Sequence, residues 1–259
     1  MGGVDHAFIV MAHGDSPYLE GCIASLAAQT VGSTILVTTS TPSDFIDAAA
    51  RVVGAPVTLN PRPDGIAADW NFALGASPAR YVTLAHQDDL YFPPFLARSL
   101  ALLQSSARAA LAFTGYLEVD DDGRASRSKI SLAKHLLERL TLGDTVEPGR
   151  GRLRAFLSLG NPLPCSSVTF DRQRLVDFAF SGAFRSNLDW DAWLRLNEAG
   201  VQFARTPERL VGRRHNPLTA TASLTREGVR RREDLIMFRR LWPRPLAGLI
   251  ALAYRTGYG

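Results

Sequence analysis

Short apolar runs alternate with amphipathic stretches along the first third of the chain. Four runs rich in β-forming residues predict buried strands at 7–12, 34–39, 56–59 and 81–85. Three stretches between them carry apolar side chains at helical spacing and predict helices at 17–29, 43–53 and 66–76. Strands that alternate with helices form parallel βαβ units with right-handed crossovers. We therefore expect an α/β fold with a Rossmann-like, mostly parallel central sheet flanked by helices.

The pattern is less regular beyond residue 91. Further helices are predicted at 94–105, 132–140, 153–159 and 225–241, with a helix start near 189. Further strands are predicted at 109–119, 167–170, 201–206 and 210–214. We expect a main domain over 1–222 and a C-terminal basic helical extension over 223–259.

Two adjacent acids, Asp88 and Asp89, follow the apolar run 81–85 directly. Open α/β sheets bind ligands in the crevice outside the carboxyl ends of their strands. Neighbouring carboxylates in such a crevice repel each other unless a cation joins them, and a divalent metal ion is the usual solution. The alternative is a solvated acidic loop that precedes the helix starting near Pro94.

The first loop excludes several nucleotide-binding classes. After the first strand it reads His13-Gly14-Asp15-Ser16-Pro17, with one glycine and neither G-x-G-x-x-G nor a P-loop. A nicotinamide enzyme, a P-loop NTPase and a methyltransferase would each need a glycine-rich loop here. A phosphatase of the haloacid-dehalogenase type would need D-x-D at this point.

The composition bears on the class of protein, its partners and its cellular compartment. Hydrophobic residues make up 46% of the chain and charged residues 21%, which is ordinary for a soluble globular protein. Only Lys129 and Lys134 among the 29 cationic residues are lysines, so the net charge of +4 reflects arginine usage and we expect no nucleic-acid partner. Cys22 and Cys165 form no disulfide framework or metal motif, which favours a reducing cytoplasm. No signal peptide and no run of 18 apolar residues is present.

Two features of the second half have both a structural and a functional interpretation. Ser186 and Asp189, three residues apart at a predicted helix start, resemble a capping box, but a helix start bearing Asp189 and Asp191 is also typical of a catalytic element. The triplet Asp120–Asp122 before Gly123 indicates a turn rather than a metal site.

The C-terminal extension combines a basic helix over 225–241 with an apolar segment over 246–254. We favour an arrangement in which the apolar segment packs on the core and the basic face is solvated. A peripheral contact with the inner, anionic face of a membrane and a second subunit in a homodimer are the alternatives.

Several motifs, taken in order, resemble those of the family 2 glycosyltransferases with a GT-A fold, over about residues 7–221. The matching segments are S-L-x-x-Q-T at 25–30, then Asn60, Gly65 and Asn71, then Gln87-Asp88-Asp89, then Leu188-Asp189-Trp190-Asp191, and finally Arg214-His215. The resemblance implies a nucleotide-binding half over about 1–120 and an acceptor half over about 121–222. It also implies Mn²⁺ or Mg²⁺, a nucleotide-diphosphate sugar donor, and a sugar, lipid-linked or small-molecule acceptor.

The resemblance assigns roles residue by residue. Asp89 would bind the metal, Asp88 the ribose or the metal, and His215 the metal or the diphosphate. Asp189 would be the catalytic base of an inverting transfer, with Asp191 and Trp190 at the acceptor. Donor contacts would come from Ala12, His13, Asp15, Thr39, Asn71 and Gln87.

Three positions depart from the family pattern. Leu188 replaces a glutamate, Gln87 stands where a carboxylate often precedes the acid pair, and the second strand ends in Thr39 rather than in a base-reading aspartate. The nucleotide is therefore not named by the sequence. A nucleotidyltransferase and a non-catalytic nucleotide-sugar-binding protein stay open as alternatives, although the first would need a glycine-rich, basic first loop.

Overall fold

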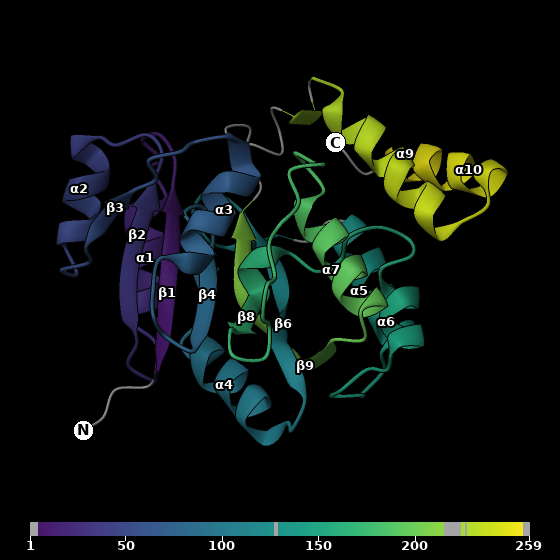
Figure 1. Cartoon of the computed structure of the whole chain (residues 1–259), viewed down its shortest axis with the longest axis horizontal. Coiled ribbons are helices and arrows are strands. Elements are labelled where there is room, and N and C mark those ends of the chain that lie inside the picture. The colour runs from purple at the N-terminus through teal and green to yellow at the C-terminus, as the bar shows by residue number, and fades with distance from the viewer. Residues whose placement is uncertain (1–4, 127–128, 215–223, 226, 256–259) are drawn as a thin grey trace.

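The computed structural model describes residues 5–126, 129–214, 224–225 and 227–255. Its centre is one mixed β-sheet, ordered β3-β2-β1-β4-β8-β6-β9-β5, with β7 paired to β6 (Figure 1). The strands are β1 (His6–Ala12), β2 (Thr34–Thr39), β3 (Val57–Leu59), β4 (Tyr81–His86), β5 (Leu90–Tyr91), β6 (Ala109–Val119), β7 (Ala125–Ser126), β8 (Val168–Asp171) and β9 (Gln202–Arg214). The predicted α/β class with a central sheet is confirmed.

Helices cover both faces of this sheet (Figure 1). They are α1 (Leu19–Ala27), α2 (Asp44–Arg51), α3 (Gly65–Gly75), α4 (Phe95–Ser105), α5 (Lys129–Thr141), α6 (Arg150–Phe156), α7 (Leu188–Glu198), α9 (Val229–Leu241) and α10 (Arg244–Arg255), with a 3₁₀ turn at Cys165–Ser167. No helix in these described segments is long and apolar enough to cross a membrane.

The alternation of side chains along β1 separates the two cores. Phe8 and Val10 pack with residues of α1, α2 and α4 on one face. Ala7 and Ile9 belong to the other core, which draws on α3, α6, α7, α9 and α10. Because β1 is buried on both faces, it reads as a continuous apolar run, as expected for a central parallel strand.

The first four strands are all parallel, as the alternating pattern predicts. Their register pairs Ala12 with Thr39 and Met11 with His86. The carboxyl ends of β1, β2 and β4 therefore lie at one edge of the sheet. In the second half β8 runs antiparallel to both β4 and β6, so the sheet as a whole is mixed.

The two strands predicted at 201–206 and 210–214 are one strand, β9. Pro207 and the charged residues after it interrupt the apolar pattern, but β9 continues beside β6 through register shifts around Gly115. At Gly115 a Cβ would lie 3.0 Å from the Pro207 carbonyl oxygen, so a glycine is needed where the two backbones approach. The prediction of two strands was wrong because the pairing of β9 with β6, which keeps the strand continuous, does not appear in the local sequence pattern.

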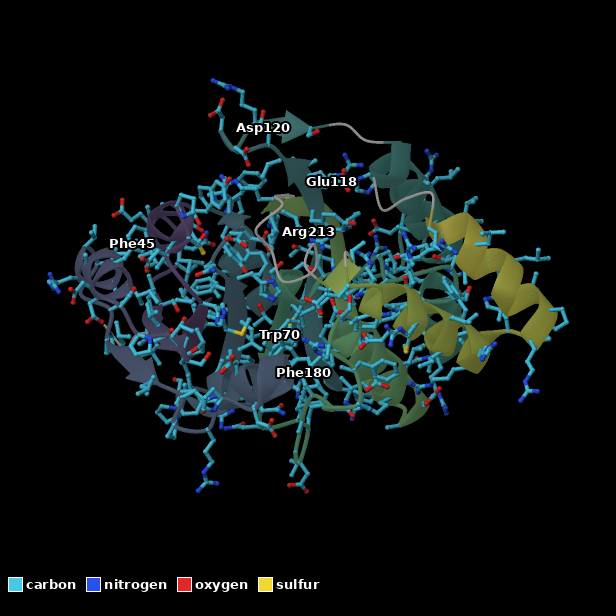
Figure 2. The ribbon with its side chains drawn as sticks, turned by 90° about the horizontal axis from the view of Figure 1, so that it is seen from above. Phe45, Trp70, Glu118, Asp120, Phe180 and Arg213 are labelled. Carbon is cyan, nitrogen blue, oxygen red and sulfur yellow. The ribbon has the colours of Figure 1, made fainter. Side chains whose placement is uncertain are left out.

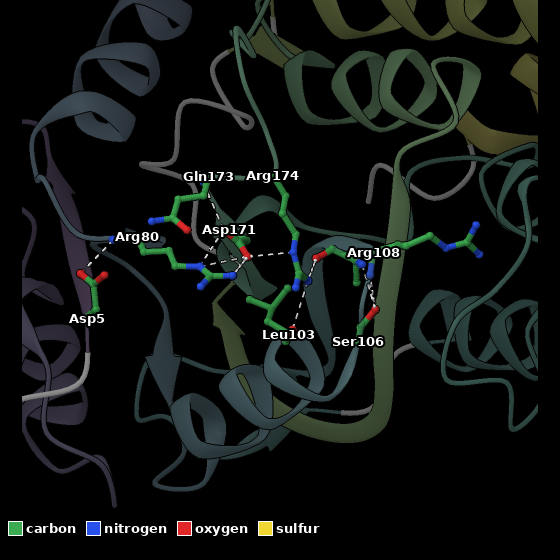
Figure 3. A network of polar contacts seen from close by, with 9 residues as sticks. Asp5, Arg80, Leu103, Ser106, Arg108, Asp171, Gln173 and Arg174 are labelled. Atoms are coloured by element: carbon green, nitrogen blue, oxygen red, sulfur yellow. Dashed lines mark hydrogen bonds and ion pairs between the residues drawn. The ribbon is translucent and has the colours of Figure 1, made fainter.

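A buried acid, Asp171 at the end of β8, binds Arg80, which precedes β4, and Arg174, which reaches the start of β6 (Figure 3). Arg80 donates from Nη2 to Asp171 Oδ2 at 2.8 Å and from Nε to Oδ1 at 3.1 Å. Arg174 lies 3.4 Å from the same carboxylate and donates to the Ala109 carbonyl at 2.8 Å. Asp171 thereby fixes the order of strands that are far apart in the sequence.

Replacing this acid should weaken the whole fold. We expect Asp171→Asn to lower the free energy of unfolding by about 2–3 kcal/mol, because two arginines lose their shared anion although both reach solvent. Urea unfolding at neutral pH measures the change. Asp177→Asn, at an exposed position with φ of 58° that asparagine tolerates, is the matched control. Equal midpoints for both variants would contradict the assigned role.

Candidate active site

A cavity of about 170 Å³ opens at the carboxyl ends of β1 and β4. It is lined by His13, Asp15, Ser16, Pro17, Tyr18, Gln87 and Asp88. Parallel strands bring their carboxyl ends to the same edge, so residues more than seventy positions apart share this space. Four residues that the sequence nominated, namely His13, Asp15, Gln87 and Asp88, therefore lie around one cavity.

The loop after β1 is held in place by the loop after β4. The Gln87 amide accepts from the His13 backbone N–H at 3.0 Å and donates to the His13 carbonyl at 2.9 Å. Ser16 Oγ donates to Asp88 Oδ1 at 2.7 Å. Gln87 departs from the family pattern. Both polar atoms of its side-chain amide bind the first loop, and Gln87 itself lines the cavity.

Asp89 is buried beneath the cavity and is tied to the last strand of the sheet. Its Oδ1 accepts from the Arg214 backbone N–H at 3.1 Å. The Arg214 guanidinium donates to the backbone carbonyls of Asp88 at 2.8 Å and Asp120 at 3.1 Å. These bonds place the end of β9 against the acid pair, while the predicted ligand His215 lies outside the described residues.

The acid pair has free capacity for a cation. Burial raises the pKa of Asp88; the Ser16 hydrogen bond opposes that rise, and the Asp89 charge adds to it. Within the described residues, the second carboxylate oxygen, Oδ2, has no protein partner in either acid. No three His, Cys, Asp or Glu side chains in that part of the chain are close enough to enclose a metal. The pair fits a divalent ion that takes its other ligands from phosphate and water.

Asp189 lies in the first turn of α7. Burial raises its pKa above the usual value for an aspartate, and hydrogen bonds from Asn161 and from the Trp190 N–H, with the Arg213 charge, partly offset the rise. The Trp190 N–H to Asp189 Oδ1 distance is 2.9 Å. A partly buried carboxylate whose neutral form is favoured is suited to accept a proton.

The capping box considered for Ser186 and Asp189 does not form. The N-cap residue of α7 is Asn187, and no side chain of the cap closes on the helix. Instead, Glu233 of α9 accepts from the backbone N–H groups of Arg185, Ser186 and Asn187 at 2.7, 2.8 and 3.0 Å. The carboxylate that the N-terminal segment of α7 needs thus comes from the C-terminal extension.

Two residues of the cleft were missed by sequence reasoning. Arg213, labelled in Figure 2, lies on β9, and its side chain has no hydrogen bond or ion pair with the described residues. Burial disfavours its charge, but Tyr116, Asp89 and Asp189 favour it and keep its pKa raised. His86 lowers the pKa of both Asp88 and Asp189, and its buried Nε2 has no hydrogen-bond partner among the described residues. Arg213 comes one residue before the Arg214-His215 motif. Successive side chains of a strand point to opposite faces, and this alternation along β9 is the only sequence signal that could have identified it.

Other predicted contacts are occupied by the protein itself. Asn71 exchanges hydrogen bonds of 2.9 and 2.8 Å with the Phe180 backbone. Thr39 is buried and accepts from the Thr41 N–H at 3.0 Å, and Ala12 is buried beside it. None of these three residues is among those that line the cavity, and the side-chain amide of Asn71 is bonded to the protein itself.

The two predicted acceptor residues lie away from the cavity. Trp190 is fully buried against Phe238, with ring centroids 5.1 Å apart, and its indole N–H donates to the Leu157 carbonyl. Asp191 is buried between Arg195 at 2.8 Å and Arg240 at 2.6 Å. Both side chains anchor α7, and this placement argues against direct contact with an acceptor.

A carboxylate does stand near the end of β2, where the sequence offered only Thr39. Asp69 of α3 accepts from Ser40 Oγ at 3.0 Å and from Asn60 Nδ2 at 2.8 Å. The family pattern places a base-reading aspartate at the end of the second strand. Asp69 was missed by sequence reasoning because this residue belongs to α3.

Comparison with models of known protein families gives no match, and comparison with the sequences of curated proteins gives none either. Comparison with solved structures does. S. aureus TarS 1–349 in complex with UDP-GlcNAc is 12% identical with a TM-score of 0.63, covering 95% of this chain and 70% of that one. The chain spans 42% of the longer TarS structure.

Two further structures are similar. Mannosyltransferase PcManGT from Pyrobaculum calidifontis, in complex with GDP-Man and Mn²⁺, is 14% identical with a TM-score of 0.62, covering 97% of this chain and 74% of that one. Glucosyl-3-phosphoglycerate synthase from Mycobacterium tuberculosis, in complex with UDP, is 19% identical with a TM-score of 0.55, covering 88% and 81%. The chain therefore has the fold of GT-A glycosyltransferases.

The charge of Arg213 should lower the pKa of Asp189. Burial raises the pKa of Asp189 and the Arg213 charge works against that rise, so Arg213→Gln should move this pKa further upward. Carbon-13 NMR titration of the aspartate carboxyl groups measures it. Arg209→Gln, at an exposed arginine of the same strand, should leave the pKa unchanged. A pKa that stays the same in Arg213→Gln would contradict the arrangement.

Proposed function

We propose that this protein is a metal-dependent, inverting glycosyltransferase that moves a sugar from a nucleotide-diphosphate donor to an acceptor hydroxyl. The observation that carries the proposal is that two acidic groups share the same charged neighbours. Asp88 and Asp89 follow β4, and Asp189 lies in the first turn of α7. His86 acts electrostatically on both Asp88 and Asp189, and both Asp89 and Asp189 act on Arg213.

The donor would lie along the carboxyl edge of the sheet. The cavity beside His13, Asp15 and Gln87 would take the nucleoside, and the diphosphate would reach the free oxygens of Asp88 and Asp89 through Mn²⁺ or Mg²⁺. The structural neighbours support this arrangement, since they are solved with UDP, UDP-GlcNAc, or GDP-Man and Mn²⁺. When bound, the metal would offset charge on the leaving diphosphate.

Asp189 would act as the base. Its raised pKa, due first to burial, matches a group that must take a proton from the acceptor hydroxyl as that oxygen attacks the anomeric carbon. Direct attack from the face opposite the leaving group inverts the configuration there. Arg213 would lie between this reaction and the diphosphate, where its cation can stabilise either anion.

Removing the base should separate binding from turnover. We expect Asp189→Asn to lower sugar transfer or slow donor hydrolysis by about 10²–10⁴-fold, while donor affinity with Mn²⁺ stays within about twofold of wild type. A panel of UDP- and GDP-sugars, followed by release of free nucleotide, measures turnover. Asp177→Asn is the matched aspartate control. Full turnover in Asp189→Asn would refute the base assignment, and wild-type binding without any turnover would instead favour a nucleotide-sugar-binding protein.

The metal role of Asp89 can be tested without activity. Asp89→Asn keeps an oxygen for the Arg214 N–H but removes the charge, so the loop should persist while metal-dependent donor binding falls at least about tenfold. Calorimetry with UDP and GDP, with Mn²⁺ and with a chelator, gives the comparison. Asp122→Asn, an exposed acid of the neighbouring turn, serves as control. Equal affinity of the wild type with and without metal would overturn this assignment.

A further inference from the structure

Helix α10 leaves a row of large apolar side chains in solvent. Leu246, Leu249 and Leu252 are 41%, 66% and 60% exposed, while Ala247 and Ala251 of the same helix are buried. A spacing of three residues puts the leucines on one side of the helix. The sequence predicted that this apolar segment packs on the core; its alanines do, but its leucines form an outer face that nothing in the described chain covers.

Helix α10 and the preceding helix α9 are rich in arginine. Residues 229–255 contain seven arginines and two acids. Both acids, Glu233 and Asp234, are buried and bonded to the start of α7. Arginines that are exposed on the same two helices are Arg231, Arg232, Arg239, Arg240, Arg244 and Arg255, of which Arg240 pairs with Asp191 and Glu198. The outward charge of α9 and α10 therefore comes from arginines alone.

We propose that the outer face of α10, defined by Leu246, Leu249 and Leu252 with its flanking arginines, binds the surface of an anionic lipid bilayer. Apolar side chains rimmed by arginine suit the boundary between acyl chains and anionic headgroups. A second copy of this chain is a poorer occupant, because an isologous contact would bring two arginine-rich faces together. This inference goes beyond the proposed function and does not depend on it.

The dimensions of α10 fix how it would meet the bilayer. Its 12 residues make a rod of about 18 Å, well short of the ~30 Å hydrocarbon core. The helix therefore lies along the interface rather than across it. The packing of Trp190 against Phe238 and Tyr254 holds α9 and α10 to α7, so the bound surface is rigidly joined to the helix that carries Asp189.

Co-sedimentation of the full chain with vesicles tests the proposal. Vesicles of phosphatidylcholine with about one third phosphatidylglycerol should bind the wild type at least about tenfold more tightly than phosphatidylcholine alone, with binding that weakens as salt rises. The triple variant Leu246→Gln/Leu249→Gln/Leu252→Gln should lose at least about tenfold of this affinity. Arg239→Gln/Arg244→Gln/Arg255→Gln should lose the preference for the anionic lipid.

A matched triple variant controls for the loss of exposed apolar surface in general. Val52, Leu59 and Val176 are 76%, 51% and 73% exposed and lie outside α9 and α10. Val52→Gln/Leu59→Gln/Val176→Gln should bind vesicles like the wild type, and all variants should keep the wild-type melting temperature. Equal binding by the leucine variant and the control variant, or no binding of the wild type to anionic vesicles, overturns the proposal. A concentration-dependent dimer that only the leucine variant abolishes, without vesicle binding, assigns the face to a second copy.

Discussion

Two adjacent carboxylates at the end of a buried strand are the constraint on which this cleft depends. Burial raises the pKa of Asp88, and the charge of Asp89 beside it adds to the rise. The protein meets this constraint with β9, whose Arg214 donates its backbone N–H to Asp89 and its guanidinium to the Asp88 carbonyl. Since these partners are about 125 residues apart, the acid pair is positioned only when both halves of the sheet have assembled.

The start of α7, which carries Asp189, depends on the C-terminal extension. Glu233 of α9 accepts hydrogen bonds from three backbone N–H groups just before α7. Arg240 of α9 forms an ion pair with Asp191 of α7. A helix start stabilised by a carboxylate from elsewhere does not need its own first-turn acid for capping. Asp189 is thereby left to the cleft, and α9 acts as a support of the candidate base rather than as an appendage.

The parts of the fold that follow local periodicity could be predicted from the sequence. The first four strands and their helices, and the position of Asp88 at the sheet edge, came from patterns that span fewer than fifteen residues. Roles set by distant partners could not be predicted. Gln87 binds the first loop, Asn71 binds the Phe180 backbone and Trp190 fills the core, and in each case the partner lies too far along the chain for a pattern to show it.

Charge balance limits what can occupy the cleft. Asp88, Asp89 and Asp189 are each partly or wholly buried, and the two neighbouring arginines, Arg213 and Arg214, offset only part of their charge. A diphosphate would add further negative charge in a region where burial strengthens repulsion. A cation would offset part of this charge in the proposed donor complex, and a divalent metal ion is the one that we propose. The charge of Arg213 opposes the rise in the pKa of Asp189, so in the proposed complex it would offset part of the negative charge there.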